Sequence, residues 1–216
     1  YGKLQDDDAT KHGNITININ NGTIGTVNTT GIGGNIYGGS KGTKTNFNLG
    51  IVRSTTINMK DGTAYASVYG GGELAQVVGS HTTKNNKNED IAVGTEINIS
   101  GGTIGTEKSN LPEGTTFGAT YGNVYGGGKG NTTDVEAGLI KTNTKINITQ
   151  ASGKTTLIRH HIYGGGAYGS VGDITYSTAE APATYVPDHA SVVNMPTKWA
   201  SNTGKAEVYV YGGTNR

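Results

Sequence analysis

The chain has 216 residues, a length that suits one or two ordinary domains or one solenoid. Lys and Arg total 17 and Asp and Glu total 16, so the near-neutral charge argues against a nucleic-acid or anionic-membrane partner. The 37 glycines follow no Gly-X-Y period, which excludes collagen, and the lack of cysteine excludes disulfides and thiolate metal sites.

Two short phrases alternate along the chain, aliphatic–Asn–aliphatic and aliphatic–Tyr–Gly–Gly, and each occurs five times. The Asn phrases are centred on Asn18, Asn58, Asn98, Asn147 and, in altered form, Asn194. The Tyr phrases contain Tyr37, Tyr69, Tyr125, Tyr163 and Tyr211. Self-similarity with a period of tens of residues indicates a stacked-repeat architecture.

Each Asn phrase has the pattern of a β-strand. In the first copy Ile15, Ile17 and Ile19 fall at every second position, which is the strand period, and the asparagine falls on the opposite face. Turn residues follow four of the copies: Asn21-Gly22, Asp61-Gly62, Gly101-Gly102 and Ser152-Gly153. Asn-Gly and Asp-Gly supply the positive φ of a tight turn.

Each Tyr phrase places an aliphatic residue directly before a tyrosine. On a strand these neighbours point to opposite faces, so either the aliphatic column faces inward and the tyrosines outward, or the reverse. The glycines that follow permit a sharp turn.

A weaker apolar run precedes the later Asn phrases, at 50–52, 91–93, 138–140 and 171–174. Three short strands per unit, joined by turns, describe one coil of a parallel β-helix. We therefore predict an all-β, right-handed parallel β-helix of about five to six coils with irregular loop insertions. In an alternative register each phrase forms its own coil of ~20 residues, giving about ten coils.

The fold is predicted as a single solenoid segment over 1–216, with loops at 81–90, 107–120 and 177–204. The last is a long non-repeat loop that holds the only tryptophan. No apolar run approaches the ~20 residues that span a bilayer, so we expect no direct membrane insertion. Tyr1-Gly2-Lys3 and Tyr211-Gly212-Gly213 place both ends within the repeat pattern. Because solenoids need polar caps, we expect a segment of a longer repeat array.

No recurring arrangement of catalytic or metal-binding residues accompanies the repeat. The glycines around Lys129 lack phosphate-loop spacing, since Gly rather than Ser or Thr follows the lysine. Arg159-His160-His161 is the densest basic cluster, but neighbouring side chains of a strand point apart and cannot share one metal. We predict no catalytic residues, no metal and no cofactor. The single histidines, His12, His81 and His189, are predicted to lie on the surface.

The two repeated columns each have two interpretations. Stacked asparagine amides form hydrogen-bonded ladders that stabilise a solenoid, or else an outer stripe that binds sugar hydroxyls. Stacked tyrosines are packing, or else an exposed platform for a carbohydrate or a protein partner. We favour the structural interpretation for both.

The motifs Asn-Gly-Thr-Ile-Gly at 21–25, Gly-Gly-Thr-Ile-Gly at 101–105 and Asn-Val-Tyr-Gly-Gly-Gly-Lys-Gly at 123–130 carry a family resemblance. Over residues 12–175 the chain resembles the very large, glycine-rich, adhesin-like surface proteins of gut Bacteroidales. The resemblance implies a parallel β-helix that is secreted or displayed on the bacterial cell surface, and it brings no catalytic residues.

The leading hypothesis is therefore a non-catalytic structural or adhesive segment, a rod that displays loops. Its predicted binding residues are Tyr185, His189 and Trp199, with Arg159 and His161 as further candidates. Its predicted partners are glycans or host or bacterial surface proteins, together with neighbouring repeats. Two alternatives stay open: a β-helix polysaccharide lyase or glycoside hydrolase with a loop-built site, and a trimeric stalk of phage or passenger type.

Overall fold

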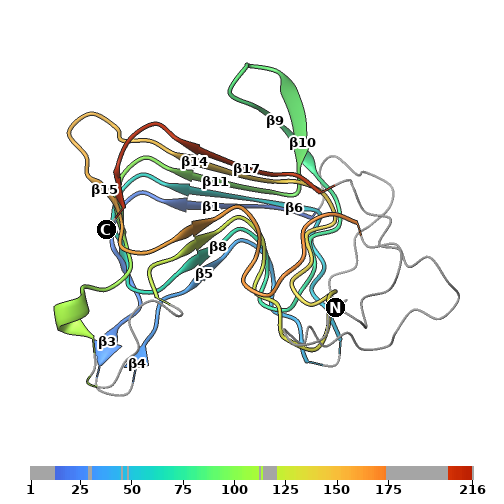
Figure 1. Ribbon diagram of the computed structural model, residues 1–216, viewed down its shortest axis with the longest axis horizontal. Helices are drawn as coiled ribbons and strands as arrows, with labels where there is room; N and C mark the ends of the chain where they lie inside the picture. The colour runs from blue at the N-terminus through green and yellow to red at the C-terminus, as the bar shows by residue number, and fades with distance from the viewer. Residues whose placement is uncertain are drawn as a thin grey trace, which may run out of the picture.

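The computed structural model describes residues 13–28, 31–44, 46–47, 49–111, 113, 121–173 and 204–215. Three parallel sheets run side by side along one stack, and each sheet collects the same phrase from successive coils (Figure 1). The predicted all-β parallel β-helix is thereby confirmed.

The Asn sheet contains the Asn phrases in chain order. Its five strands are β1 (Asn14–Ile19), β6 (Ser54–Met59), β11 (Thr95–Ile99), β14 (Thr144–Ile148) and β17 (Ala206–Val210). All neighbours pair in parallel, and Asn18, Asn58, Asn98 and Asn147 share one register position. The alternating aliphatic side chains face inward, so that Ile57, Ile97 and Ile146 are fully buried.

Two further sheets complete each coil. The turn sheet follows the Asn-Gly turns and contains β2 (Thr23–Ile24), β7 (Thr63–Ala64), β12 (Gly102–Ile104), β15 (Thr156–Ile158) and β18 (Thr214–Asn215). The Tyr sheet contains β5 (Ile36–Tyr37), β8 (Val68–Tyr69), β13 (Val124–Tyr125) and β16 (Ile162–Tyr163). In the first four coils each phrase pairs with its own kind. One coil therefore contains both phrases, and the register with about ten short coils is wrong.

A column of isolated parallel bridges closes each coil before the next Asn strand. It joins Val52, Val77, Ile140 and Val171. The weak apolar run is thus confirmed at Val52 and Ile140, but the prediction at 91–93 is wrong because Val77 holds that place. Buried side chains of this column form a small second core beside the main one.

Residues 81–93 form a β-hairpin, whereas we predicted a loop for 81–90. β9 (His81–Lys84) pairs antiparallel with β10 (Asp90–Val93), and the hairpin stands out from the Asn sheet (Figure 1). Asn85 accepts backbone N–H groups from Lys87 and Glu89 and so closes the tip. Two smaller elements accompany the coils: the antiparallel pair β3 (Val27–Asn28) and β4 (Gly31–Ile32), and the 3-10 turn η1 (Lys108–Asn110).

The fifth coil differs from the prediction. Tyr209, in β17, pairs with Asn147, and the predicted fifth asparagine, Asn194, lies outside the described residues. Tyr211 does not join the Tyr sheet, because Val210 pairs with Ile148 in the Asn sheet and Gly212-Gly213 form the turn into β18.

Glycines of the Tyr phrases let adjacent coils approach each other. A Cβ on Gly70 would lie 2.1 Å from the carbonyl oxygen of Gly126, and one on Gly126 would lie 2.2 Å from that of Gly164. The first glycine of the first three Tyr phrases is therefore required by contact between coils as well as by turn geometry.

Buried threonines join the three inner Asn strands, β6, β11 and β14, to the Tyr strand of the same coil. The hydroxyls of Thr55, Thr95 and Thr144 each donate a 2.6 Å hydrogen bond to a glycine carbonyl of the Tyr phrase. Because Thr55 and Thr95 are fully buried, these bonds satisfy polar groups that have no access to water.

The asparagine side chains form a ladder along the outer face of the Asn sheet. Each Nδ2 donates to the Oδ1 of the preceding coil, over 2.9 Å to Asn18, 3.0 Å to Asn58 and 2.6 Å to Asn98. The predicted ladder is confirmed.

Replacing an inner ladder residue is expected to cost more than replacing the end residue. Asn98 makes two ladder bonds and Asn18 makes one. We expect Asn98→Ala to lower the free energy of unfolding by roughly 2 kcal/mol and Asn18→Ala by about 1 kcal/mol or less. Urea unfolding measures both, and equal losses would show that the ladder does not set the difference.

Candidate functional site

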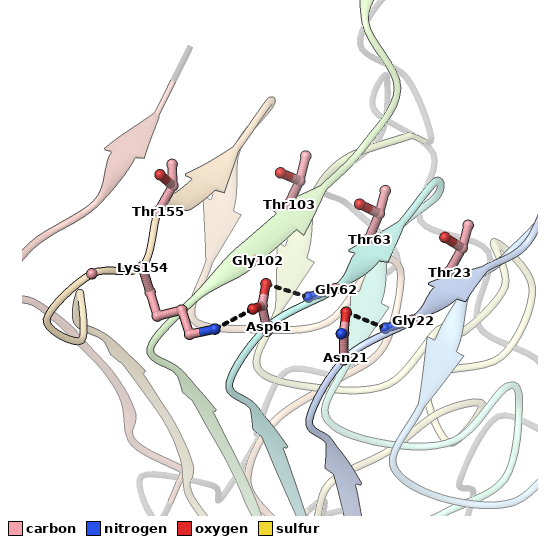
Figure 2. A pocket seen from close by; sticks show the side chains of 11 residues that line it. Asn21, Gly22, Thr23, Asp61, Gly62, Thr63, Gly102, Thr103, Lys154 and Thr155 are labelled. Carbon is pink, nitrogen blue, oxygen red and sulfur yellow. Dashed lines mark hydrogen bonds and ion pairs between the residues drawn. The ribbon is translucent and has the colours of Figure 1, made fainter.

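An open groove of about 430 Å³ crosses the turns between the Asn sheet and the turn sheet (Figure 2). Four successive coils line it: Asn21, Gly22, Thr23, Asp61, Gly62, Thr63, Gly102, Thr103, Gly153, Lys154 and Thr155. The first three coils contribute the same Gly-Thr turn, so this part of the groove presents a repeating surface to anything lying along the stack.

The groove is shaped by one recurring turn. Asn21 Oδ1 accepts the N–H of Gly22 at 2.7 Å, and Asp61 Oδ1 accepts that of Gly62 at 2.8 Å. Both glycines have positive φ, +101° and +99°. The predicted tight turns are therefore present, and the short side chain before each glycine holds the turn through its own hydrogen bond.

The third coil has no side chain at this place. A Cβ on Gly101 would lie 2.3 Å from the carbonyl oxygen of Lys60 and 3.2 Å from Lys154 Cβ. Across this gap Lys154 of the fourth coil donates to Asp61 Oδ2 of the second (Figure 2). That hydrogen bond, with the Gly62 N–H, holds the pKa of Asp61 below its usual value. The Gly101-Gly102 pair thus gives Lys154 room to reach over a whole coil.

A line of threonines forms the other wall. Thr23, Thr63 and Thr103 are register neighbours, and Figure 2 shows their side chains and that of Thr155 projecting from the same face. Thr23 and Thr155 are exposed, and the middle two are half-buried. Each hydroxyl can donate one hydrogen bond and accept two, so the wall suits a ligand rich in hydroxyl groups.

A second polar cluster lies under the β9–β10 hairpin, on the outer face of the Asn sheet. Lys145 Nζ donates to Glu96 Oε1 at 2.9 Å, to Thr83 Oγ1 at 3.3 Å and to the carbonyl oxygen of Lys84. His81 Nε2 lies 3.3 Å from Glu96 Oε2. The Lys145 and Glu96 side chains are only 6% and 10% exposed. The prediction of His81 as a surface residue is wrong, because the hairpin folds it against this ion pair.

Burial opposes ionisation of the Glu96 carboxyl, but contacts with His81, Lys145 and Thr83 outweigh it and lower its pKa from 4.5 to about 2. The ionised Glu96 carboxylate accepts hydrogen bonds from Lys145 in β14 and from Thr83 in the hairpin. This cluster fastens the hairpin and leaves little of the carboxylate for chemistry on a bound molecule.

The depressed pKa of Glu96 predicts a pH window for its contribution. Because the pKa is lower in the folded state, ionised Glu96 stabilises the fold fully above pH 4.5, and this contribution is lost as the pH falls towards about 2. The Tm advantage of the wild type over Glu96→Gln should therefore shrink across that window. Two Tm–pH curves that run parallel from neutral pH to pH 2 would contradict it.

The tyrosines form a stacked column on the Tyr sheet. Ring centroids are 4.8 Å apart for Tyr37 and Tyr69 and 4.9 Å apart for the next two pairs. The structural interpretation is confirmed for the inner rings, since Tyr69 and Tyr125 are buried, whereas Tyr163 at the end is 43% exposed. Burial, with a smaller effect of Glu73, raises the pKa of Tyr37 to about 12.

Of the two orientations predicted for the Tyr phrase, the one with the aliphatic residues facing inward is present. The aliphatic residues face the core, as Val68 and Val124 show, yet the inner tyrosines are also shielded by their neighbours in the column. Beside the column, Glu73 binds Lys41 at 3.1 Å and Lys129 at 3.0 Å. Lys129 lies among glycines that lack phosphate-loop spacing. In the structure it joins neighbouring coils through its ion pair with Glu73.

The predicted binding residues are not brought together among the described residues. Tyr185, His189 and Trp199 lie outside them. Arg159 Nη2 binds Glu107 Oε1 at 2.8 Å, and the His161 ring lies edge-on to Tyr163 at 5.8 Å. In the described part of the chain no group of three His, Asp or Glu could hold a metal ion, and no helix is long and apolar enough to cross a membrane.

The threonines that line the groove could be recognised in the sequence. Thr23, Thr63 and Thr103 each follow a turn glycine, so their spacing marks one outer column. The long reach of Lys154 to Asp61 had no such signal, because it joins residues 93 positions apart.

Comparison with protein-family models, with curated proteins and with solved structures finds no match to this chain.

Proposed function

We propose that the chain is a non-catalytic, adhesin-like segment of a secreted or cell-surface protein, which binds an extended, hydroxyl-rich glycan along the groove of Figure 2. The observation that carries the proposal is that four consecutive coils line one continuous groove, the first three with the same Gly-Thr turn and the fourth with Thr155 on the same face.

The repeated residues that hold coils together are different from those that line the groove, and this supports the proposal. The Asn ladder, the Tyr column and the threonine clasps use the repeated residues to hold coils together. The turns after the Asn strands face outward. A polymer lying along the stack would meet an equivalent threonine in each of the first three coils and Thr155 in the fourth, and several weak contacts on one chain add to a useful affinity.

Charge in the groove favours a neutral glycan. Its acidic and basic side chains, Asp61 and Lys154, already bind each other. A polyanion would meet the Asp61 carboxylate and a polycation would meet the Lys154 ammonium. Threonine hydroxyls and backbone groups can donate or accept hydrogen bonds, so they can bind the neutral hydroxyl groups of a glycan in either role.

A glycan array, followed by calorimetry with the best neutral polysaccharide, tests the proposal. We expect Thr63→Val with Thr103→Val to weaken binding about tenfold, because two hydroxyl contacts are lost. Thr82→Val, at an exposed position of the hairpin, is the matched control and should bind as the wild type does. No binding to any glycan, or equal binding by all variants, would refute the groove as the site.

A polysaccharide lyase or hydrolase is the second candidate, and one observation favours it. Arg159 and Glu107 lie within 2.8 Å of each other, with His161 two positions along the chain from Arg159. Turnover of a polysaccharide that is lost in Glu107→Gln, with fold and glycan binding intact, would establish this function in place of the first.

A further inference from the structure

A second pocket, of about 420 Å³, lies where the chain leaves the Tyr sheet. Its volume is within the range of roughly 300 to 1,000 Å³ that is usual for small-molecule sites. It shares no residue with the groove of Figure 2. Three successive coils contribute to its lining, which includes Lys44, Glu73, Leu74, Lys129, Asn131 and Thr132.

The charged side chains give this pocket a positive balance. Its lining has two lysines, Lys44 and Lys129, and one carboxylate, Glu73. Glu73 binds Lys129 at 3.0 Å and also Lys41, outside the lining, at 3.1 Å. Burial opposes ionisation of Glu73, but the bonds from the two lysines outweigh it and lower its pKa. One ionised carboxylate therefore serves two ammonium groups, and each ammonium has three N–H donors.

Lys44 is the cation that the protein leaves available. Among the described residues it has neither an ion pair nor a side-chain hydrogen bond, and it is exposed. Asp134 and Glu136 come soon after the pocket residues in the chain, but they do not line the pocket. Glu136 Oε2 accepts a hydrogen bond of 3.4 Å from Gln76 Nε2. The positive charge of Lys44 is thus free to meet an anion.

The third coil adds neutral hydrogen-bonding groups. Asn131 Oδ1 accepts the N–H groups of Thr133 at 2.9 Å and Asp134 at 2.8 Å, which fixes the orientation of the amide. Its Nδ2 has no hydrogen-bond partner among the described residues. The neighbouring Thr132 is exposed, and its hydroxyl can donate one hydrogen bond and accept two. These groups suit the hydroxyls of a ligand.

Leu74 supplies an apolar contact in the same pocket. It is half-buried and has a φ of +66°, a conformation that residues with a Cβ rarely adopt. The third coil holds its backbone from both sides, since its N–H donates to the Lys129 carbonyl at 2.8 Å and its carbonyl accepts the Gly138 N–H at 2.9 Å. Strained residues that are held in this way are concentrated at ligand sites.

We propose that this pocket binds a single acidic sugar unit, with its anionic group at Lys44 and Lys129. The sugar hydroxyls bond to Asn131 and Thr132, and the C–H face of the ring covers Leu74. A bare inorganic anion would use the lysines and leave the other groups of the pocket unused. Carboxylate and sulfate both suit a lysine ammonium, so the shared chemistry is an anionic group on a hydroxyl-bearing ring. This site takes a different ligand class from the groove and does not depend on it.

NMR titration of the whole chain at physiological salt, which screens distant charges, tests the ligand class. The probes are glucuronate, glucose 6-sulfate, glucose and inorganic sulfate. We expect one of the two acidic sugars to bind about tenfold more tightly than glucose and than inorganic sulfate, and to shift the amide signals of 129–133. The tighter of the two identifies the anionic group. Inorganic sulfate that binds equally well would mean an adventitious ion only, and it would overturn the proposal, as would the absence of binding by both acidic sugars.

Two matched pairs of variants place the ligand. Lys44→Met should weaken binding of the acidic sugar about tenfold, whereas Lys87→Met, which removes the same charge at the exposed hairpin tip, should bind as the wild type does. Lys129→Met and Lys41→Met each remove one ion pair of Glu73, but only Lys129 lines the pocket. Lys129→Met should therefore weaken binding about tenfold and Lys41→Met by no more than about twofold.

Wild-type affinity in Lys44→Met, or equal losses within either pair, would contradict the proposed site. Circular dichroism checks the fold of each variant, and the exposed Lys44 keeps the test decisive if Lys129→Met fails to fold. Because the two sites share no residue and the groove is tested with a neutral polysaccharide, either proposal can fail without the other.

Discussion

Gly126→Ala is expected to lower the free energy of unfolding by about 3 kcal/mol or more. The added Cβ would lie 2.2 Å from the carbonyl oxygen of Gly164 and 3.1 Å from Thr144 Cβ. The same carbonyl accepts the 2.6 Å bond from Thr144 Oγ1. Backbone of the next coil cannot move away without breaking that bond, so one methyl group disturbs both the stacking and the clasp.

Gly165→Ala is the matched control. It lies in the Tyr phrase of the next coil, and its Cβ would meet nothing within 4 Å. We expect its unfolding midpoint in urea to stay near that of the wild type, with a change within about 0.5 kcal/mol. If both variants lost stability equally, the glycines would act through turn conformation rather than through contact between coils.

Lys145→Met is expected to destabilise the protein by roughly 3 kcal/mol, because it leaves the Glu96 carboxylate buried under the hairpin without its cation. Replacing both partners, as Glu96→Leu with Lys145→Met, should recover most of that loss, since apolar side chains of similar volume remove the unpaired charge. Chemical denaturation measures both variants. Hydrogen exchange in β9 and β10 should report local opening in the single variant alone.

The control for Lys145 lies on the same hairpin. Lys84 binds Asp90 at 2.9 Å, but both side chains are more than half exposed. Lys84→Met should therefore cost about 0.5 kcal/mol or less. A loss as large as that of Lys145→Met would mean that the hairpin contributes through its own strand pairing and not through the buried ion pair.

The sequence predicts the repeated columns well, because they depend on local alternation. Ile17-Asn18-Ile19 and its copies have the strand period, and a strand that repeats in a solenoid stacks on itself. The stacked Tyr37, Tyr69 and Tyr125 follow from the same argument. The strand period and the turn residues are enough to predict these columns.

The fifth coil was predicted wrongly because Val210-Tyr211-Gly212-Gly213 has the residues of a Tyr phrase, although its strand register is that of an Asn phrase. Val208-Tyr209-Val210 followed by Tyr211-Gly212-Gly213-Thr214 has the layout of Ile97-Asn98-Ile99 followed by Ser100-Gly101-Gly102-Thr103. Tyr211 therefore stands where Ser100 stands, one step after the strand. The Gly-Gly-Thr turn was the available signal.

The contacts between sheets could not be predicted, since they join residues far apart along the chain. Thr95 finds its acceptor at Gly126, 31 positions on, and His81 meets Glu96 only because 81–93 folds back as a hairpin. A threonine three positions before Asn58, Asn98 and Asn147 is visible as a pattern, but its acceptor depends on how the coil closes.

The hydrogen bonds of the three sheets run from coil to coil, so a pulling force along the stack would load them one after another and peel coils from an end. The bond from Lys154 to Asp61 is different, because it ties the fourth coil to the second across the third. We expect it to act as a brace under tension, so that single-molecule stretching of Lys154→Met shows these coils separating at lower force than in the wild type.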